Sequence, residues 1–195
     1  MHAATRREEV AVEPEIKLHE SKLLAQVREA YTALRSAKLV YMIVGGVAVN
    51  AHGVLRATQD LDVMVRLEDS DALNSVLETL GYEAVDRRDD LAHYLRRDGA
   101  RLDVLYSRRP ITAELLKHPD HARYSDLNIP IVSIEGLIGL KVQSFNDDPR
   151  RIRDLEDIMR LIKGNRDKLD MAAVGEYFDL FGRRQLLDDV LRAIG

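Results

Sequence analysis

The sequence contains no cysteine, and it has no apolar run long enough to cross a bilayer. Disulfide frameworks, thiolate zinc sites and catalytic cysteines are therefore excluded, and a reducing compartment is expected. The N-terminal stretch "MHAATRREEVAVEPE" also lacks the apolar segment of a secretory signal, so we expect a cytoplasmic protein without a membrane partner. Chemistry must come from carboxylates, histidines, hydroxyls or basic side chains.

Several functional motifs are missing as well. There is no Walker A loop, no G-x-G-x-x-G fingerprint and no G-x-S-x-G elbow. His118 and His121 have neither zinc spacing nor a third ligand. A net charge of -4 argues against a general basic surface for nucleic acid, although doublets such as Arg108-Arg109 can form local basic patches.

The length of 195 residues fits one domain, with or without a small appendage. We expect a flexible tail over residues 1–14, because charged and small residues alternate there up to a proline. A core follows over residues 15–132, and a helical segment over residues 133–195 is expected to pack on it. The predicted fold class is α/β (α+β), a small mixed sheet with flanking helices and a helical C-terminal part.

Within the core, helical periodicity begins at Glu15 and is followed by a buried strand, "LVYMIV", that ends at Gly45-Gly46. The pattern then predicts a short helix over 48–52, a strand over 60–67 and a helix over 69–80. Asp98-Gly99 predicts a tight hairpin inside residues 92–107, with positive φ at both turn positions.

The rest of the chain divides into a part whose secondary structure the sequence pattern does not predict and a part that is predicted to be helical. Three prolines break any long element between residues 107 and 132. Ser133 is predicted to cap the next helix, and Asp148 to cap another that has Pro149 in its first turn and Gly164 after its end. Two more helices are expected over about 168–180 and 183–193.

Three aspartates form the strongest chemical pattern. Residues two apart in a strand face the same side, so Asp60 and Asp62 share one face while Leu61, Val63 and Val65 face the other. Carboxylates about 7 Å apart repel by about 2 kcal/mol at an effective dielectric near 20. Asp103 alternates in the same way on the returning hairpin strand, and it joins the pair if that strand lies alongside.

Such a cluster suits a hard divalent cation. Carboxylate oxygens with room for waters and phosphates favour Mg²⁺ or Mn²⁺ over zinc. Two such ions about 4 Å apart can activate a hydroxyl and stabilise a leaving pyrophosphate. Gly45 and Gly46, between a strand and a helix, allow backbone N–H groups to approach a phosphate closely.

Together, Gly45-Gly46, the pattern Arg56-x-Thr58-x-Asp60-x-Asp62 and Asp103 resemble the DNA polymerase β-type nucleotidyltransferase superfamily. Within it the sequence is most similar to small bacterial nucleotidyltransferases of the AbiEii abortive-infection toxin type. The resemblance covers about residues 38–106 and, more loosely, the helical stretch over residues 134–161. The superfamily usually has Gly-Ser where this chain has Gly-Gly.

The resemblance implies a nucleotidyltransferase-like fold and a role for each matching residue. Gly45 and Gly46 would hold the nucleotide phosphates, and Arg56 and Thr58 would shape the loop or touch phosphate. Asp60, Asp62 and Asp103 would bind the metal ions and carry catalysis, with Asp103 as the base for the acceptor hydroxyl. The implied reaction moves a nucleoside monophosphate from an NTP to a hydroxyl and releases pyrophosphate.

Lys141 interrupts an apolar helix face, so it must snorkel or meet an anion. We hypothesise that it reaches the triphosphate, with Arg153 and Asp154 flanking the cleft. In that next helix, periodicity predicts a buried stripe of Ile152, Leu155, Met159 and Ile162.

The sequence alone does not identify the acceptor of the nucleotide. Resemblance to the toxins suggests RNA, in particular the tRNA 3′ end, and a cognate antitoxin, whereas an acidic chain better fits a compact acceptor such as an aminoglycoside. A protein side chain is a further alternative. The competing function is a nucleotide-binding or interaction module of the same fold that does not transfer a nucleotide.

Three residues near the motif also have purely structural interpretations. Arg56 could merely pair with Asp60, Thr58 could simply suit a strand, and His52 could pack at a helix end.

Overall fold

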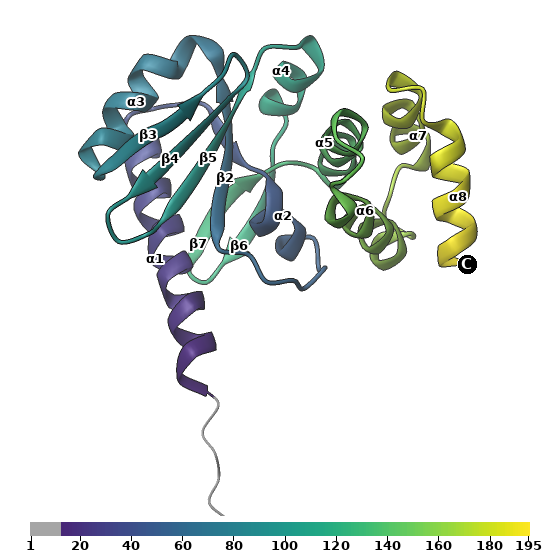
Figure 1. The fold of residues 1–195 in the computed structure, drawn as a ribbon, viewed down its shortest axis with the longest axis horizontal. Coiled ribbons are helices and arrows are strands. Elements are labelled where there is room, and N and C mark those ends of the chain that lie inside the picture. Colours follow the sequence, from purple (N-terminus) through teal and green to yellow (C-terminus); the bar gives the residue numbers. More distant parts are fainter. Residues whose placement is uncertain (1–12) are drawn as a thin grey trace, which may run out of the picture.

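The described chain forms a seven-stranded mixed sheet with helices on both faces (Figure 1). The computed structural model describes the backbone of residues 13–195 and the side chains of residues 22–195. The strand order is β3-β4-β5-β2-β1-β7-β6. The β2–β5 and β1–β7 pairs are parallel, and the other neighbouring pairs are antiparallel. The predicted fold class is therefore confirmed.

The first half of the described chain supplies five neighbouring strands of the sheet, with helices on both faces. Its elements are α1 (Glu13–Ser36), β1 (Tyr41–Ile43), α2 (Gly45–Ala51), β2 (Asp60–Arg66), a 3₁₀ turn (Leu67–Asp69), α3 (Ser70–Thr79), β3 (Tyr82–Arg87), β4 (Leu91–Arg96) and β5 (Arg101–Ser107). The second half adds α4 (Pro110–Lys117), β6 (Asp120–Tyr124), β7 (Leu127–Ile131), α5 (Ile134–Asp147), α6 (Ile152–Asn165), α7 (Met171–Leu180) and α8 (Arg184–Ile194). No helix within the described residues is both long and apolar enough to span a membrane.

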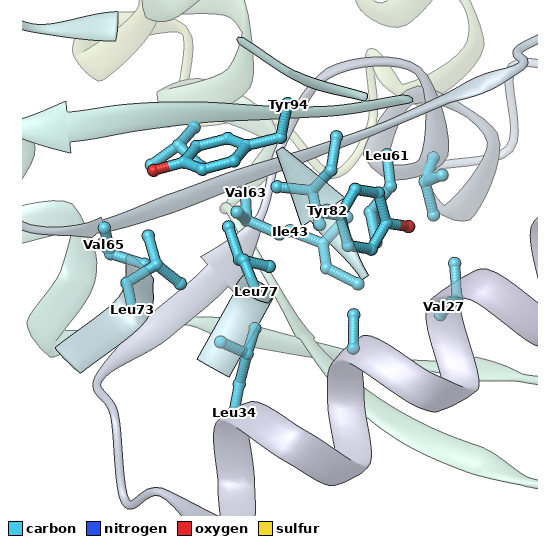
Figure 2. Close-up of a cluster of buried hydrophobic side chains, with 14 of the residues drawn as sticks. Val27, Leu34, Ile43, Leu61, Val63, Val65, Leu73, Leu77, Tyr82 and Tyr94 are labelled. Atoms are coloured by element: carbon cyan, nitrogen blue, oxygen red, sulfur yellow. The ribbon is translucent and has the colours of Figure 1, made fainter. Parts of the chain in front are cut away.

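Strand β2 shows how the sheet separates core from site. Its odd residues Leu61, Val63 and Val65 are buried in a cluster with α1 and α3 (Figure 2). Its even residues face the other side, where Met64 joins a second cluster and the aspartates lie near α2 and α5. The predicted alternation is confirmed, and it places the carboxylates away from the larger core of Figure 2.

The second apolar cluster joins the sheet to the C-terminal helices. Met42 and Met64 from the sheet pack in one cluster with side chains from α2 and from α5 through α8, including Ile138, Ile158 and Phe178. A helical C-terminal part that packs on the sheet was predicted, and Figure 1 shows α5 and α6 on the side of α2, with α7 and α8 beyond them. The division at residue 132 itself stays a prediction.

Several local boundaries differ from the sequence-based prediction. Helix α1 begins at Glu13 rather than Glu15, and Pro14 falls in its first turn, where a missing N–H costs nothing. Most of the predicted tail, residues 1–12, lies outside the described residues. At the Asp98-Gly99 turn only Gly99 has positive φ, +86°. The loop is wider than a two-residue turn, because Arg96 N–H donates to Ala100 O across it.

Longer-range features were missed. Strand β3 was not expected, and residues 107–132, which resisted interpretation, contain α4, β6 and β7. Strand β7 lies beside β1, in parallel, despite Pro130. Helix α6 begins at Ile152, not at Pro149, because Asp148 instead accepts the N–H of Arg150 in a preceding turn.

The buried face of α6 was predicted only in part: Ile162 is fully buried, and Leu155 and Met159 are partly buried against the same cluster. The buried residues of α6 are Asp154, Asp157, Ile158, Leu161 and Ile162, whereas Ile152 is 55% exposed. Two aspartates occupy core-facing positions because they meet a buried lysine from α5. Ser133 caps α5 as predicted, accepting the N–H of Gly136 at 3.2 Å.

We predict that Leu61→Ala lowers the free energy of unfolding by about 2–5 kcal/mol, because it empties space at the sheet centre. Leu55→Ala is the matched control, since Leu55 is 87% exposed and Leu61 is fully buried. The control should stay within about 0.5 kcal/mol of the parent protein in urea denaturation. Equal losses in both variants would contradict the assigned core.

Candidate active site

A cleft of about 760 Å³ lies where the faces of β2 and β5 meet α5 and the start of α6. Six of the eight predicted site residues line it: Gly45, Gly46, Arg56, Asp62, Asp103 and Lys141. The other two adjoin it, because Thr58 touches the Gly46 position and the charge of Asp60 acts on Asp62. The structure therefore brings the predicted residues into one place.

The register of β2 and β5 sets the position of the acids. Asp62 lies directly beside Asp103 in the parallel pair, while Asp60, at the start of β2, lies beside Arg101. The condition under which Asp103 joins the pair is met, because the hairpin strand β5 lies beside β2. Side chains directly opposite in adjacent strands lie about 5 Å apart at Cβ, so the two carboxylates interact strongly.

This neighbourhood changes the acidity of Asp62. Burial, and then the charges of Asp103 and Asp60, raise the pKa of Asp62 to about 6, although the Gly46 N–H and Lys141 act in the opposite direction. The cations of the chain therefore do not fully offset the repulsion between the acids. A carboxyl group whose pKa is displaced by burial and like charge in a cleft is typical of functional sites.

Gly45 is required by the acid beside it. Its φ is +59°, and a Cβ at this position would lie 2.0 Å from Asp62 Oδ2. The next residue, Gly46, donates its backbone N–H to the same Oδ2 at 3.3 Å. The glycine turn and the carboxylate are therefore packed as one unit, with a backbone donor holding Asp62 in place.

Gly46 is required by a different pair of neighbours. A Cβ there would lie 2.3 Å from Thr58 Oγ1 and 2.8 Å from one guanidinium nitrogen of Arg56. A serine at this position, as in the usual superfamily pattern, would have no room unless these side chains moved. Arg56 does not pair with Asp60 in the structure; its Nε lies 3.4 Å from Asp157 Oδ2.

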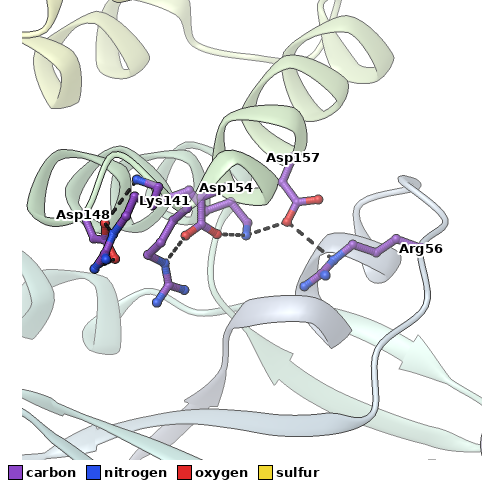
Figure 3. A network of polar contacts seen from close by, with 7 residues as sticks. Arg56, Lys141, Asp148, Asp154 and Asp157 are labelled. Carbon is purple, nitrogen blue, oxygen red and sulfur yellow. Dashed lines mark hydrogen bonds and ion pairs between the residues drawn. The ribbon is translucent and has the colours of Figure 1, made fainter.

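Lys141 meets two anions, as the interruption of its apolar helix face indicated. It is 6% exposed, and its Nζ lies 3.0 Å from Asp154 Oδ1 and 2.7 Å from Asp157 Oδ2. Although burial opposes ionisation of Asp154, Lys141 and Arg151 hold the pKa of that carboxyl below its usual value. With Arg56 these side chains form a continuous charged network (Figure 3).

Of two further placements made from the sequence, that of Arg153 is wrong and that of His52 at a helix end is confirmed, because His52 is the C-terminal cap of α2. Arg153 was expected to flank the cleft, but Arg151 lines it together with Asp154. His52, expected to pack at a helix end, contacts Val132 O at 2.8 Å through Nε2 and has no part in the cleft lining.

His93 is a cleft residue that sequence reasoning missed. It lies on β4 directly opposite Asp103, and its Nδ1 is 2.7 Å from Asp103 Oδ1. The hairpin signal alone would have missed it: a two-residue Asp98-Gly99 turn would place His93 opposite Val104, whereas the observed wider loop, with Leu95 opposite Arg101, places His93 opposite Asp103. The acid on β5 thus has Asp62 on one side and an imidazole on the other.

The donor atoms fit a divalent cation, while the arrangement leaves a ligand cage incomplete. Carboxylate oxygens are the ligands that Mg²⁺ and Mn²⁺ prefer, and a cation would offset the burial and the like charges that raise the pKa of Asp62. Among the described side chains, however, no three His, Cys, Asp or Glu residues already stand together as metal ligands. Ligation by Asp60, Asp62 and Asp103, and the identity of the ion, stay predictions.

Comparison with protein families supports the expected enzyme class. The family model of aminoglycoside-2″-adenylyltransferases matches residues 26–109, less than half of the chain but including every strand from β1 to β5. No curated protein matches the sequence. The model supports the nucleotidyltransferase superfamily and gives no support to the AbiEii type in particular.

Solved structures share the fold at low sequence identity. The antibiotic-resistance factor ANT(2″)-Ia in solution is 15% identical, with a TM-score of 0.67 over 90% of this chain and 100% of its own. Its crystal structure with adenylyl-2″-tobramycin is 17% identical, with a TM-score of 0.65 over 84% and 99%. A nucleotidyltransferase from Thermotoga maritima, described as putative, is 12% identical, with a TM-score of 0.55 over 70% and 94%. The chain has the nucleotidyltransferase fold.

We predict that Asp62→Asn stabilises the protein increasingly as pH rises. The pKa of Asp62 is raised from its ordinary value of 3.8 to about 6, so its contribution to stability is full below pH 3.8 and is lost as pH rises through 6. Asparagine cannot ionise, so the variant should gain about 1–3 kcal/mol over the parent between pH 4 and pH 7.

Urea denaturation at the two pH values, without divalent cations, measures this gain. The exposed Asp167→Asn serves as control and should follow the parent protein. Parallel curves for Asp62→Asn and the parent would contradict the displaced pKa.

Lys141→Met should cost about 3–5 kcal/mol of unfolding free energy, because it leaves two buried carboxylates without their shared cation. Lys163→Met, on an exposed face of α6, is the matched control and should cost less than about 0.5 kcal/mol. Chemical denaturation of both variants at pH 7 tests this; a loss no larger in Lys141→Met than in the control would contradict a stabilising network.

Proposed function

We propose that this protein is a metal-dependent nucleotidyltransferase that moves a nucleoside monophosphate from an NTP to a hydroxyl group and releases pyrophosphate. One observation carries the proposal: Asp62 and Asp103 lie side by side at a glycine turn, inside a cleft that also holds Arg56 and Lys141. The matching family model and the shared fold support the same reaction class.

In the proposed reaction Asp103 accepts the proton of the acceptor hydroxyl as its O–H bond breaks. The oxygen then forms a bond to the α-phosphorus, and the bond between that phosphorus and the leaving pyrophosphate breaks. Asp60, Asp62 and Asp103 would hold a divalent cation, Mg²⁺ or Mn²⁺. When bound, the cation supplies positive charge that offsets the carboxylates and the phosphates.

The phosphates of the NTP are proposed to lie at the glycine turn. Backbone N–H groups of Gly45 and Gly46 would face them, with Thr58 and Arg56 beside the turn. Lys141 lines the same cleft, but its Nζ is held by two carboxylates. Its proposed phosphate contact therefore requires Nζ to shift partly away from Asp154 or Asp157.

A small cationic acceptor fits this cleft better than RNA. Its lining is mixed in charge: Asp89, Asp90 and Asp147 add carboxylates that would attract ammonium groups, while Arg108, Arg109 and Arg151 line it as well and suit the phosphates of the NTP. Its volume of about 760 Å³ is that of a small-molecule site. Solved structures of the same fold carry adenylyl-2″-tobramycin and lincomycin, so we propose an aminoglycoside-like or lincosamide-like hydroxyl acceptor.

Calorimetric titration with each of the four NTPs, with and without Mg²⁺ or Mn²⁺, tests the site without knowledge of the acceptor. We expect cation-dependent binding that Asp60→Ala/Asp62→Ala abolishes and that Asp167→Ala, an exposed control, retains. Absence of binding for every NTP would favour the alternative, a non-catalytic module of the same fold.

Pyrophosphate release with tobramycin, lincomycin or total tRNA as acceptor then separates the acceptor classes. We expect release with a cationic small molecule, and its loss in Asp62→Ala and Asp103→Ala. Transfer to tRNA alone would contradict the proposed small-molecule acceptor. It would instead favour the toxin-like function, with a cognate antitoxin, that the AbiEii resemblance suggested.

A further inference from the structure

Asp103 has a hydrogen-bond partner that the proposed reaction has not yet used. The Nδ1 atom of His93 lies 2.7 Å from Asp103 Oδ1, and the two side chains are 35% and 30% exposed. Both line the cleft. A distance of 2.7 Å is that of a strong hydrogen bond to a carboxylate, in which Nδ1–H donates and Oδ1 accepts.

The position of this contact is fixed by the sheet. His93 and Asp103 are directly paired residues of antiparallel β4 and β5, so both backbones hold them face to face. Among the described side chains, His93 is the hydrogen-bond partner of Asp103, and no lysine or arginine forms an ion pair with that carboxylate. The imidazole is therefore what orients the acid.

A proton acceptor needs orientation as well as charge. The terminal torsion of an aspartate is broad, and the neighbouring Asp62 repels the carboxylate. Binding Oδ1 leaves Oδ2 as the free oxygen.

We propose that His93 is a positioning residue that holds the Asp103 carboxylate with one oxygen directed at the acceptor hydroxyl. The inference rests on the proposed function, because it assigns His93 a role in that same transfer. The proton moves from the acceptor O–H to Asp103, and His93 keeps its own Nδ1 proton throughout.

The test uses two amide substitutions that differ in where they place an N–H. The side-chain nitrogen of asparagine occupies the place of Nδ1, whereas that of glutamine corresponds to Nε2. With ATP, Mg²⁺ and tobramycin, His93→Ala and His93→Gln should lower kcat about 10- to 100-fold. KM for ATP should not change, and His93→Asn should restore most of kcat.

The control is His121→Ala, an exposed histidine on β6 at the far edge of the sheet. Thermal melting of each variant confirms that it is folded. Full activity in His93→Ala, with Asp103→Ala inactive, would overturn the role of His93 while leaving the proposed function in place. Equal losses in His93→Asn and His93→Ala would also overturn it, because the donor at Nδ1 would not be what matters.

Failure of the proposed function has a different signature. If the parent protein releases no pyrophosphate with any NTP or acceptor, the transfer reaction and the role of His93 in it both fall. Nitrogen-15 NMR of the His93 ring then reports on the contact alone. The Nδ1–H tautomer is expected in the parent protein, and its loss is expected in Asp103→Ala; its absence from the parent would overturn the hydrogen bond itself.

Discussion

The structure depends on one electrostatic constraint: two carboxylates, Asp62 and Asp103, lie side by side in parallel strands. Burial and their mutual repulsion raise the pKa of Asp62 to about 6, so the arrangement opposes the stability of the ligand-free protein. The groups around them act on this pair. The Gly46 N–H donates to Asp62, and His93 contacts Asp103. A costly pair supported in this way is typical of a functional site rather than of a structural one.

The glycines belong to the same constraint. Sequence reasoning assigned them to the approach of a phosphate, but the structure gives a prior reason for each. A side chain at Gly45 would collide with Asp62, and one at Gly46 would collide with Thr58 and Arg56. The protein's own packing requires both glycines even without a ligand, so the glycine pair alone does not establish phosphate binding. The contacts do show that the turn, the strand and the loop are packed closely together.

Local signals predicted the local parts of this unit, and long-range contacts account for what was missed. Alternation along β2 placed Asp62 on the site face, and Ser133 marked the start of α5. Strand β7 was not predicted, because its pairing with the distant strand β1 produces no local sequence pattern and Pro130 argues against a strand. The aspartates in the buried face of α6 were missed because periodicity treats aspartate as a surface residue, whereas Asp157 is 1% exposed.

That aspartate connects the C-terminal helices to the site. A buried ion pair is weak evidence for stability, because desolvation offsets most of its attraction, but it can fix geometry. Asp157 lies between Lys141 and Arg56, and the guanidinium of Arg56 in turn lies against the Gly46 position. Helix α6 therefore helps to determine where positive charge stands beside the glycine turn. The sheet supplies the acidic side chains and the helical part positions the basic side chains of Arg56 and Lys141, so the cleft requires both parts of the chain.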